Sequence, residues 1–182
     1  MPPIVVAAII LLIVLIPVIW WVKTSNGFKR KTIKTQESLS GIEVALTKRF
    51  DLLTKLLDVA KGYAEHEKAL FTQVIELRRG MSVTQMNEAS GQLDAMAARI
   101  NAVAESYPEL RSAEVFRELQ LGIRDAEEHL QAARRLYNSN VTALNTAVDV
   151  FPSSIVAKSQ NAQKCEFFVA EATKRADVTM KF

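Results

Sequence analysis

The chain has 182 residues, with 23 Lys and Arg, 20 Asp and Glu, and a single cysteine, Cys165. Five basic residues lie between positions 23 and 34, directly after the apolar segment 4–22. Without these five, the chain carries 18 basic against 20 acidic side chains. The positive net charge therefore lies beside that segment and excludes a basic nucleic-acid-binding domain. One cysteine excludes an intramolecular disulfide framework and fits a reducing compartment.

The first predicted element is a membrane-spanning helix. Residues 4–22 contain 19 side chains without charge or polarity, and as a helix they measure about 28 Å, close to the hydrocarbon core of a bilayer. A spanning helix tolerates Pro17, and Trp20 and Trp21 stand where aromatic rings prefer the headgroup level. A cleaved secretory signal would have a basic start and a shorter apolar run, so we predict an uncleaved transmembrane anchor over residues 1–23.

A basic juxtamembrane segment, residues 24–41, follows the anchor and is predicted to be helical. The residues expected to contact the membrane surface are Lys23, Lys29, Arg30, Lys31 and Lys34. No basic residue precedes the span, so the positive-inside rule places the N-terminus outside and the rest of this single-pass protein on the cytoplasmic side of a bacterial inner membrane. The basic residues are a topology signal, and recognition of anionic lipids is a second interpretation that is compatible with it.

The remaining residues, 42–182, predict a cytoplasmic helical domain. Apolar residues recur at three- and four-residue spacing over residues 42–79, in two adjacent seams that form a wide apolar face. A helix with such a face touches more than one neighbour. The next helix begins at Ser82, where Ser82 and Gln85 form a capping box.

Two further helices are expected after the second one. Ser106 and Glu109 form another capping-box pattern around Pro108, which predicts a third helix that continues to Pro152. A weaker amphipathic pattern predicts a last helix over residues 153–176. Short turns between long helices make neighbours antiparallel. The predicted fold is therefore all-α, with a single transmembrane helix followed by an elongated antiparallel bundle of about four long helices.

The polar cluster around residue 66 is the strongest candidate for chemistry. Tyr63, His66 and Glu67 share one helix face, but the second His of a zinc-protease motif is missing at position 70. Neither His66 nor His129 follows a glutamate by three residues, as a di-iron bundle requires. Hydrogen bonding between packed helices explains the cluster, so we expect no enzyme activity, no metal and no cofactor. A metal-dependent or hydrolytic enzyme that uses His66 and Glu67 is the competing hypothesis.

Short motifs along nearly the whole chain form one ordered series: Arg49, Asp51-Leu52-Leu53, Leu56, Lys61-Gly62-Tyr63-Ala64-Glu65-His66-Glu67, Glu105-Ser106-Tyr107-Pro108-Glu109-Leu110, Arg135-Leu136-Tyr137-Asn138 and Phe151-Pro152. Together with the anchor, this series resembles the signature of the LemA family of bacterial membrane proteins. The chain departs from the family at Leu53-Thr54-Lys55, where relatives usually have Ile-Pro-Asn, and at Ser25-Asn26, where they have Tyr-Asn. A proline kink expected in relatives is therefore not expected here.

The resemblance implies an antiparallel helical bundle, a single span and no accepted catalytic activity. Relatives include a protein of magnetosome membranes, which by analogy suggests a membrane-organising role. The residues that match the family motifs, and to which the resemblance assigns a packing face, are Arg49, Asp51, Tyr63, His66, Glu67, Tyr107, Pro108, Tyr137 and Asn138.

Two non-enzymatic functions remain after these considerations. The leading hypothesis is a membrane-anchored scaffold that self-assembles through its bundle and organises or remodels the cytoplasmic face of the bacterial membrane. The alternative is a monomeric adaptor that recruits a membrane protease or a signalling protein. The expected partners are the lipid bilayer, including anionic lipids, a second copy of the chain and a protein that the sequence does not identify. No nucleic acid is expected.

Overall fold

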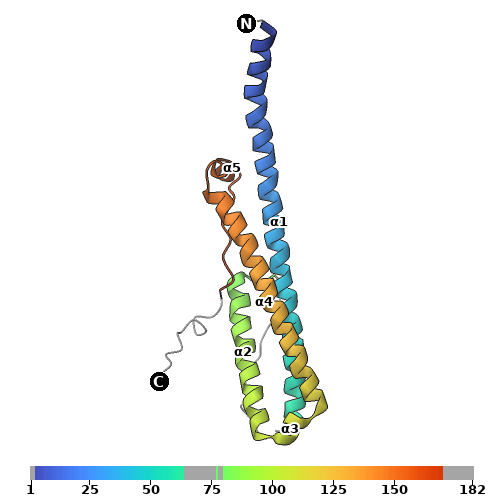
Figure 1. The fold of residues 1–182 in the computed structure, drawn as a ribbon. Coiled ribbons are helices and arrows are strands. Elements are labelled where there is room, and N and C mark those ends of the chain that lie inside the picture. Colours follow the sequence, from blue (N-terminus) through green and yellow to red (C-terminus); the bar gives the residue numbers. More distant parts are fainter. Residues whose placement is uncertain (1–2, 64–76, 78–79, 170–182) are drawn as a thin grey trace, which may run out of the picture. The chain divides into compact units, whose positions relative to one another are not determined.

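The computed structural model of the chain describes residues 3–63, 77 and 80–169, and every regular element in these ranges is a helix (Figure 1). This confirms the all-α fold class. In chain order the elements are α1 (Pro3–Tyr63), α2 (Val83–Ser106), α3 (Pro108–Ser112), α4 (Glu114–Asp149) and α5 (Ser153–Ser159). They divide into two compact units, which are described in turn. The first combines the chain up to Glu37 with Asn138–Glu166, and the second combines Ser38–Tyr137 with the chain from Phe167 onward.

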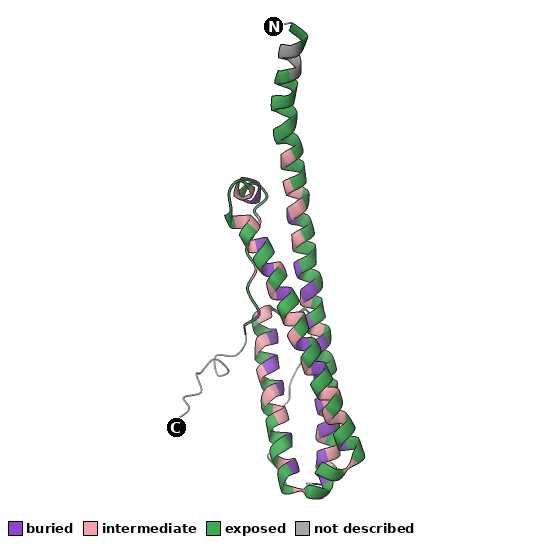
Figure 2. Cartoon of the chain, in the orientation of Figure 1, coloured by how far each residue is buried: buried purple, intermediate pink, exposed green. Residues whose placement is uncertain are grey.

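Helix α1 contains 61 residues, and Pro17 lies inside it. Its side chains from residue 11 to residue 19 are all exposed (Figure 2). Among the described residues, α1 is the one helix that is long and apolar enough to cross a membrane. The expected apolar helix at the N-terminus is therefore confirmed. The helix also runs without interruption through residues 24–41 and past Thr54 to Tyr63. The predicted continuation of this helix to Arg79 falls largely outside the described ranges, which omit residues 64–76 and 78–79.

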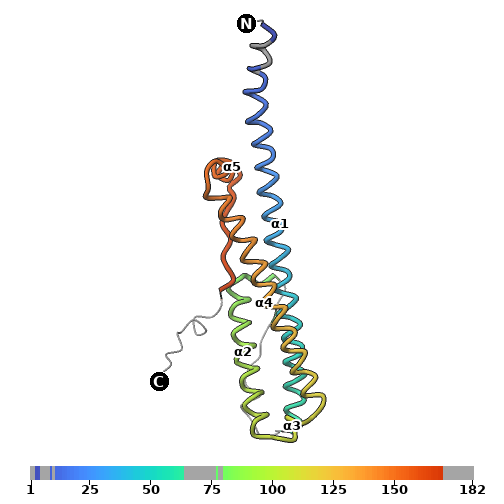
Figure 3. The backbone as a smooth tube through the Cα atoms, viewed as in Figure 1, coloured from blue at the N-terminus to red at the C-terminus, as the bar shows by residue number. Residues whose placement is uncertain are grey.

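The second unit is built from the later part of α1 with α2, α3 and most of α4. Its buried apolar residues recur at three- and four-residue intervals, as the seams predicted, and α1 alone contributes Ile42, Leu46, Leu53, Leu56 and Ala60. Helix α2 begins with the predicted capping box: Gln85 N donates to Ser82 Oγ at 3.2 Å, and Ser82 N donates to Gln85 Oε1 at 2.9 Å. Figure 3 traces the chain from α2 through α3 into α4.

The predicted single helix from Ser106 to Pro152 is wrong, because the chain forms two helices separated at Ala113. Ser106 is the last residue of α2, and Tyr107 takes the N-cap position of α3 without a side-chain cap. Pro108 stands in the first turn of α3, as expected. The break at Ala113, whose backbone is extended, ends a short helix that buries Leu110 completely. The local capping signals predicted a helix start near Pro108. They did not predict the break at Ala113, which accompanies the burial of Leu110.

The first unit has a small apolar core formed by Phe28 of α1, Leu144 of α4, and Val156 and Ala157 of α5. Trp20, Ala147, Val148, Ala162 and Cys165 pack against it. A cis peptide bond joins Phe151 to Pro152 between α4 and α5.

The predicted last helix over residues 153–176 is also wrong, because α5 ends at Ser159 and residues 162–169 are not helical. Asn161 has a positive φ of 50°. The amides of Asn161 and Ala162 bond back to the carbonyls of Lys158 and Ala157. These two bonds form a Schellman motif, which stops a helix by satisfying its last carbonyl groups. Asparagine is one of the few residues other than glycine that adopts this left-handed conformation at small cost.

Candidate functional site

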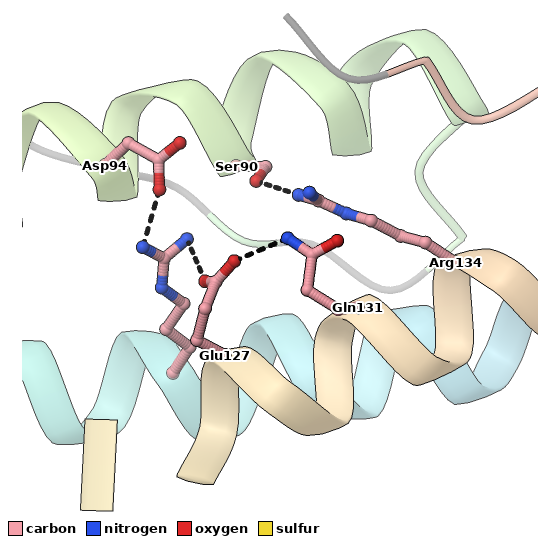
Figure 4. A network of polar contacts seen from close by, with 6 residues as sticks. Ser90, Asp94, Glu127, Gln131 and Arg134 are labelled. Atoms are coloured by element: carbon pink, nitrogen blue, oxygen red, sulfur yellow. Dashed lines mark hydrogen bonds and ion pairs between the residues drawn. The ribbon is translucent and has the colours of Figure 1, made fainter. Parts of the chain in front are cut away.

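A network of polar side chains joins α1, α2 and α4 inside the second unit (Figure 4). Its centre is Arg49 of α1, which is only 5% exposed. Arg49 Nη2 donates to Asp94 Oδ1 of α2 at 2.5 Å, and Arg49 Nη1 lies 3.2 Å from Glu127 Oε2 of α4. One guanidinium therefore holds carboxylates from two other helices.

The network continues along α4 and reaches the C-terminal segment. Gln131 Nε2 donates to Glu127 Oε1 at 2.7 Å. One turn further, Arg134 donates to the hydroxyl of the buried Ser90 on α2. The Arg134 guanidinium also lies 4.8 Å from the ring centroid of Phe168, in a cation–π contact. The last described residues of the chain are thus tied to the same group of helices.

The charges of this network balance, since two guanidinium groups are matched by two carboxylates. Removing one partner from a buried ion pair lowers folding stability by much more than the intact pair adds to it, because a buried charge is left without compensation. Buried ion pairs of this kind can fix the register in which helices pack. Within the described ranges, no group of three His, Cys, Asp or Glu side chains is placed to hold a metal ion.

A second, exposed polar group lies on the surface of the same unit. Lys48 Nζ donates to Asp125 Oδ2 at 2.6 Å, and His129 Nε2 lies 3.4 Å from Asp125 Oδ1. The hydrogen bond from Lys48 holds the pKa of Asp125 below its usual value of 3.8. Because these side chains are about half exposed, solvent screens the pair and its contribution to stability is small.

An open hollow with a volume of about 710 Å³ lies along α1. Val44, which is 69% exposed, and Leu52 provide its apolar surface. Charged side chains of both signs surround them, and the described lining residues are Ser40, Glu43, Val44, Thr47, Lys48, Asp51, Leu52 and Lys55. An apolar surface with a mixed charged rim has the composition of a protein-docking surface.

The residues that the resemblance assigned to a packing face have different surroundings. Arg49 and Tyr137 are buried, whereas Tyr107 and Asn138 are half-buried. The exposed members are Asp51, Tyr63 and Pro108. His66 and Glu67 lie outside the described residues, so their role in packing and the competing enzyme hypothesis stay predictions.

The residues predicted at the membrane lie at the end of the apolar segment of α1 and directly after it. Trp20 is half-buried, because it packs against the core of the first unit, and Trp21 is exposed. Among the five basic residues, Lys31 is half-buried, and the exposed ones are Lys23, Lys29, Arg30 and Lys34. Their contact with a membrane surface stays a prediction.

Sequence analysis did not identify the partners of Arg49. A signal was present, since Glu127, Gln131 and Arg134 follow one another at intervals of four and three residues on one face of α4. Ser90 and Asp94 are likewise one turn apart on α2. Polar residues repeating at core spacing indicate a buried polar network, but the pairing of three helices cannot be derived from spacing alone.

Comparisons of the sequence with known proteins identify a family and two relatives. The model of the LemA family matches residues 38–182. The chain is 24% identical over 163 residues to Protein LemA of Metamycoplasma hominis, covering 87% of this chain and 74% of that protein. It is 20% identical over 173 residues to Magnetosome protein MamQ of Magnetospirillum gryphiswaldense, covering 79% of this chain and 64% of that protein. The chain therefore spans slightly less than two thirds of the second relative. Neither name describes an enzyme.

Proposed function

This chain belongs to the LemA family, and we propose that it is a non-enzymatic, membrane-anchored scaffold that self-assembles through its helical bundle. It organises or remodels the cytoplasmic face of a bacterial inner membrane. The observation that carries the proposal is the hollow along α1, which offers an apolar docking surface on the same helix that carries the apolar segment.

The membrane part of the proposal is supported by the exposed apolar side chains at the start of α1. Exposing a row of apolar side chains to water is unfavourable, and transfer into the hydrocarbon core of a bilayer relieves this cost. The basic residues that follow favour the cytoplasmic side by the positive-inside rule. The name of the relative MamQ, a magnetosome protein, fits a role at a membrane.

Self-assembly is supported by the composition of the hollow. Val44 and Leu52 supply apolar area, and Glu43 and Lys48 are among the charges of opposite sign beside them. Mixed charges avoid the like-charge repulsion that would keep identical surfaces apart. Copies anchored in one membrane carry α1 in the same direction, so their hollows lie at the same height above the bilayer.

The test is to place a charge on the apolar surface of the hollow. In Val44→Asp the docking surface carries an unpaired carboxylate, so we expect the full-length protein in nanodiscs to shift from an assembly to smaller species. The matched control is Leu121→Asp, since Leu121 is 60% exposed on α4 and does not line the hollow. Mass measurement by light scattering reads the result, and circular dichroism checks that both variants keep their helices. An unchanged mass in Val44→Asp argues against the hollow as the assembly surface.

The adaptor function uses the same hollow for a helix of another protein, such as a membrane protease or a signalling enzyme. It predicts a monomeric chain of 20.3 kDa that binds one partner at a fixed ratio. If the wild-type protein is monomeric and Val44→Asp releases such a partner in a pull-down, the adaptor replaces the scaffold.

A further inference from the structure

The corner between α4 and α5 exposes three large apolar side chains that lie within six residues of one another in the sequence. Phe151 is 76% exposed, Val150 is 51% exposed and Ile155 is 50% exposed. Single exposed apolar residues are common on protein surfaces, but a cluster that includes an aromatic ring at a turn marks a surface for another molecule or for a membrane.

The first unit places this corner at the height where the apolar segment of α1 ends. Asn140 of α4 donates to the carbonyl oxygen of Lys34 at 3.3 Å, and Leu144 shares a core with Phe28. Later residues of α4 thus meet earlier residues of α1, which makes the two helices antiparallel. From Asn140 to Asp149, the end of α4, is about 13 Å of helix.

The same distance back along α1 from Lys34 reaches Ser25. Gln160, directly after α5, donates to the hydroxyl of Ser25, in agreement with this register. Trp20 also packs against the core that contains Val156 of α5. The corner is therefore level with Ser25, about 6 Å of helix beyond Trp21. A spanning helix enters the headgroup region at such aromatic residues.

Several backbone groups of the corner are already hydrogen-bonded internally, which favours a lipid environment. The Ser153 hydroxyl lies 2.8 Å from the carbonyl oxygens of both Ala147 and Val150. The amide of Ser154 donates to the carbonyl of Val150 at 2.9 Å, and Pro152 has no amide hydrogen.

The charge next to the corner is also compensated. Asp149 Oδ2 lies 2.8 Å from Lys164 Nζ, so the carboxylate at the end of α4 is paired. Lys158, at the end of α5, is exposed and carries a positive charge. A paired acid and an exposed base beside apolar side chains suit an interface with anionic headgroups.

We propose that the corner formed by Val150, Phe151 and Ile155 inserts into the headgroup and upper acyl region of the bilayer that α1 crosses. The chain then contacts one leaflet twice, through α1 and through a wedge built from α4 and α5. This inference rests on the membrane anchoring in the proposed function and adds a second lipid-binding surface to it.

The test measures the depth of single spin labels on the full-length protein in liposomes that contain anionic lipid. Labels are attached to Phe151→Cys, to Ala143→Cys and to Val14→Cys, each in a Cys165→Ala background that keeps its helical circular dichroism. Ala143 is an exposed residue of α4, about 12 Å of helix before the corner, and is the matched control. Val14 lies in the apolar segment and reports the anchor.

We expect collisions with oxygen to dominate at residues 14 and 151, and collisions with a water-soluble nickel complex to dominate at residue 143. Nickel-dominated collisions at residue 151, with residue 14 in lipid, would overturn the wedge and leave the anchor intact. Protection of residue 151 from both reagents would show that protein covers the corner, and this also overturns the wedge. Water exposure at residue 14 would overturn the anchor itself, and with it the proposed function.

Discussion

At Arg49, one buried guanidinium binds carboxylates from two helices that are far apart in the sequence. The side chains of its acidic partners are only partly exposed, at 23% for Asp94 and 32% for Glu127. Each of the three charged groups is stabilised by the others. Removing one lowers the free energy of unfolding, because the remaining charges lose their compensation.

The substitution Arg49→Ala leaves two carboxylates close together without a cation. We expect it to lower the free energy of unfolding by about 3 kcal/mol, at the lower end of the range for breaking a buried ion pair because both acids keep some solvent contact. Denaturant titration of the full-length protein in detergent measures the loss. The control Lys48→Ala removes a solvent-screened pair and has a clearly smaller effect. Equal losses in the two variants would show that Arg49 does not hold the helices together.

The exposed pair gives a prediction for the pH dependence. Lys48 holds the pKa of Asp125 below 3.8, so the pair contributes its stability above that pH and loses it as the pH falls through the lowered pKa. In Lys48→Met the pKa of Asp125 should rise back toward 3.8. An NMR titration of the Asp125 carboxyl group measures the change. No difference between the wild type and Lys48→Met would contradict the assigned hydrogen bond.

Among the elements, the segment after α5 is shaped by a side chain from another helix. Asn145 of α4 pairs with the backbone of Cys165 twice: Asn145 Nδ2 donates to the Cys165 carbonyl, and Cys165 N donates to Asn145 Oδ1, both at 2.9 Å. Both backbone groups are available because residues 162–169 are not helical, whereas a helix would use them internally.

The variant Asn145→Ala removes both hydrogen bonds. We expect the amide of Cys165 to exchange with deuterium markedly faster, because its acceptor is lost and the segment opens locally. Hydrogen-exchange mass spectrometry or NMR measures this rate. Thr142→Ala is the control, since the Thr142 hydroxyl bonds only the carbonyl of Asn138 within its own helix at 2.9 Å. Unchanged exchange at Cys165 in Asn145→Ala would show that the segment is held by other contacts.

The elements that sequence reasoning predicted well depend on local signals. The apolar segment of α1, the capping box at Ser82 and the spacing of Leu46, Leu53 and Leu56 act within one helix. The errors arose where contacts between elements decide the structure. Asn145 binds both backbone groups of Cys165 at a place where the amphipathic pattern favours a helix. Likewise, Arg49 was selected through its family motif, but its partners on α2 and α4 follow only from the packing of three helices.

Across the whole molecule, α1 and α4 each contribute to both compact units. The first unit contains the exposed apolar segment and the second contains the buried polar network and the hollow. We therefore assign membrane contact to the first unit and contact between copies to the second. If the proposed division of roles holds, copies of the anchored protein associate, and the mass of the assembly reports this directly.

The measurement that tests the scaffold most directly is the mass of the full-length wild-type protein in nanodiscs, determined by native mass spectrometry. We predict a discrete species at a whole-number multiple of 20.3 kDa at concentrations where an unrelated single-span protein stays monomeric. A chain that is monomeric under the same conditions would contradict self-assembly.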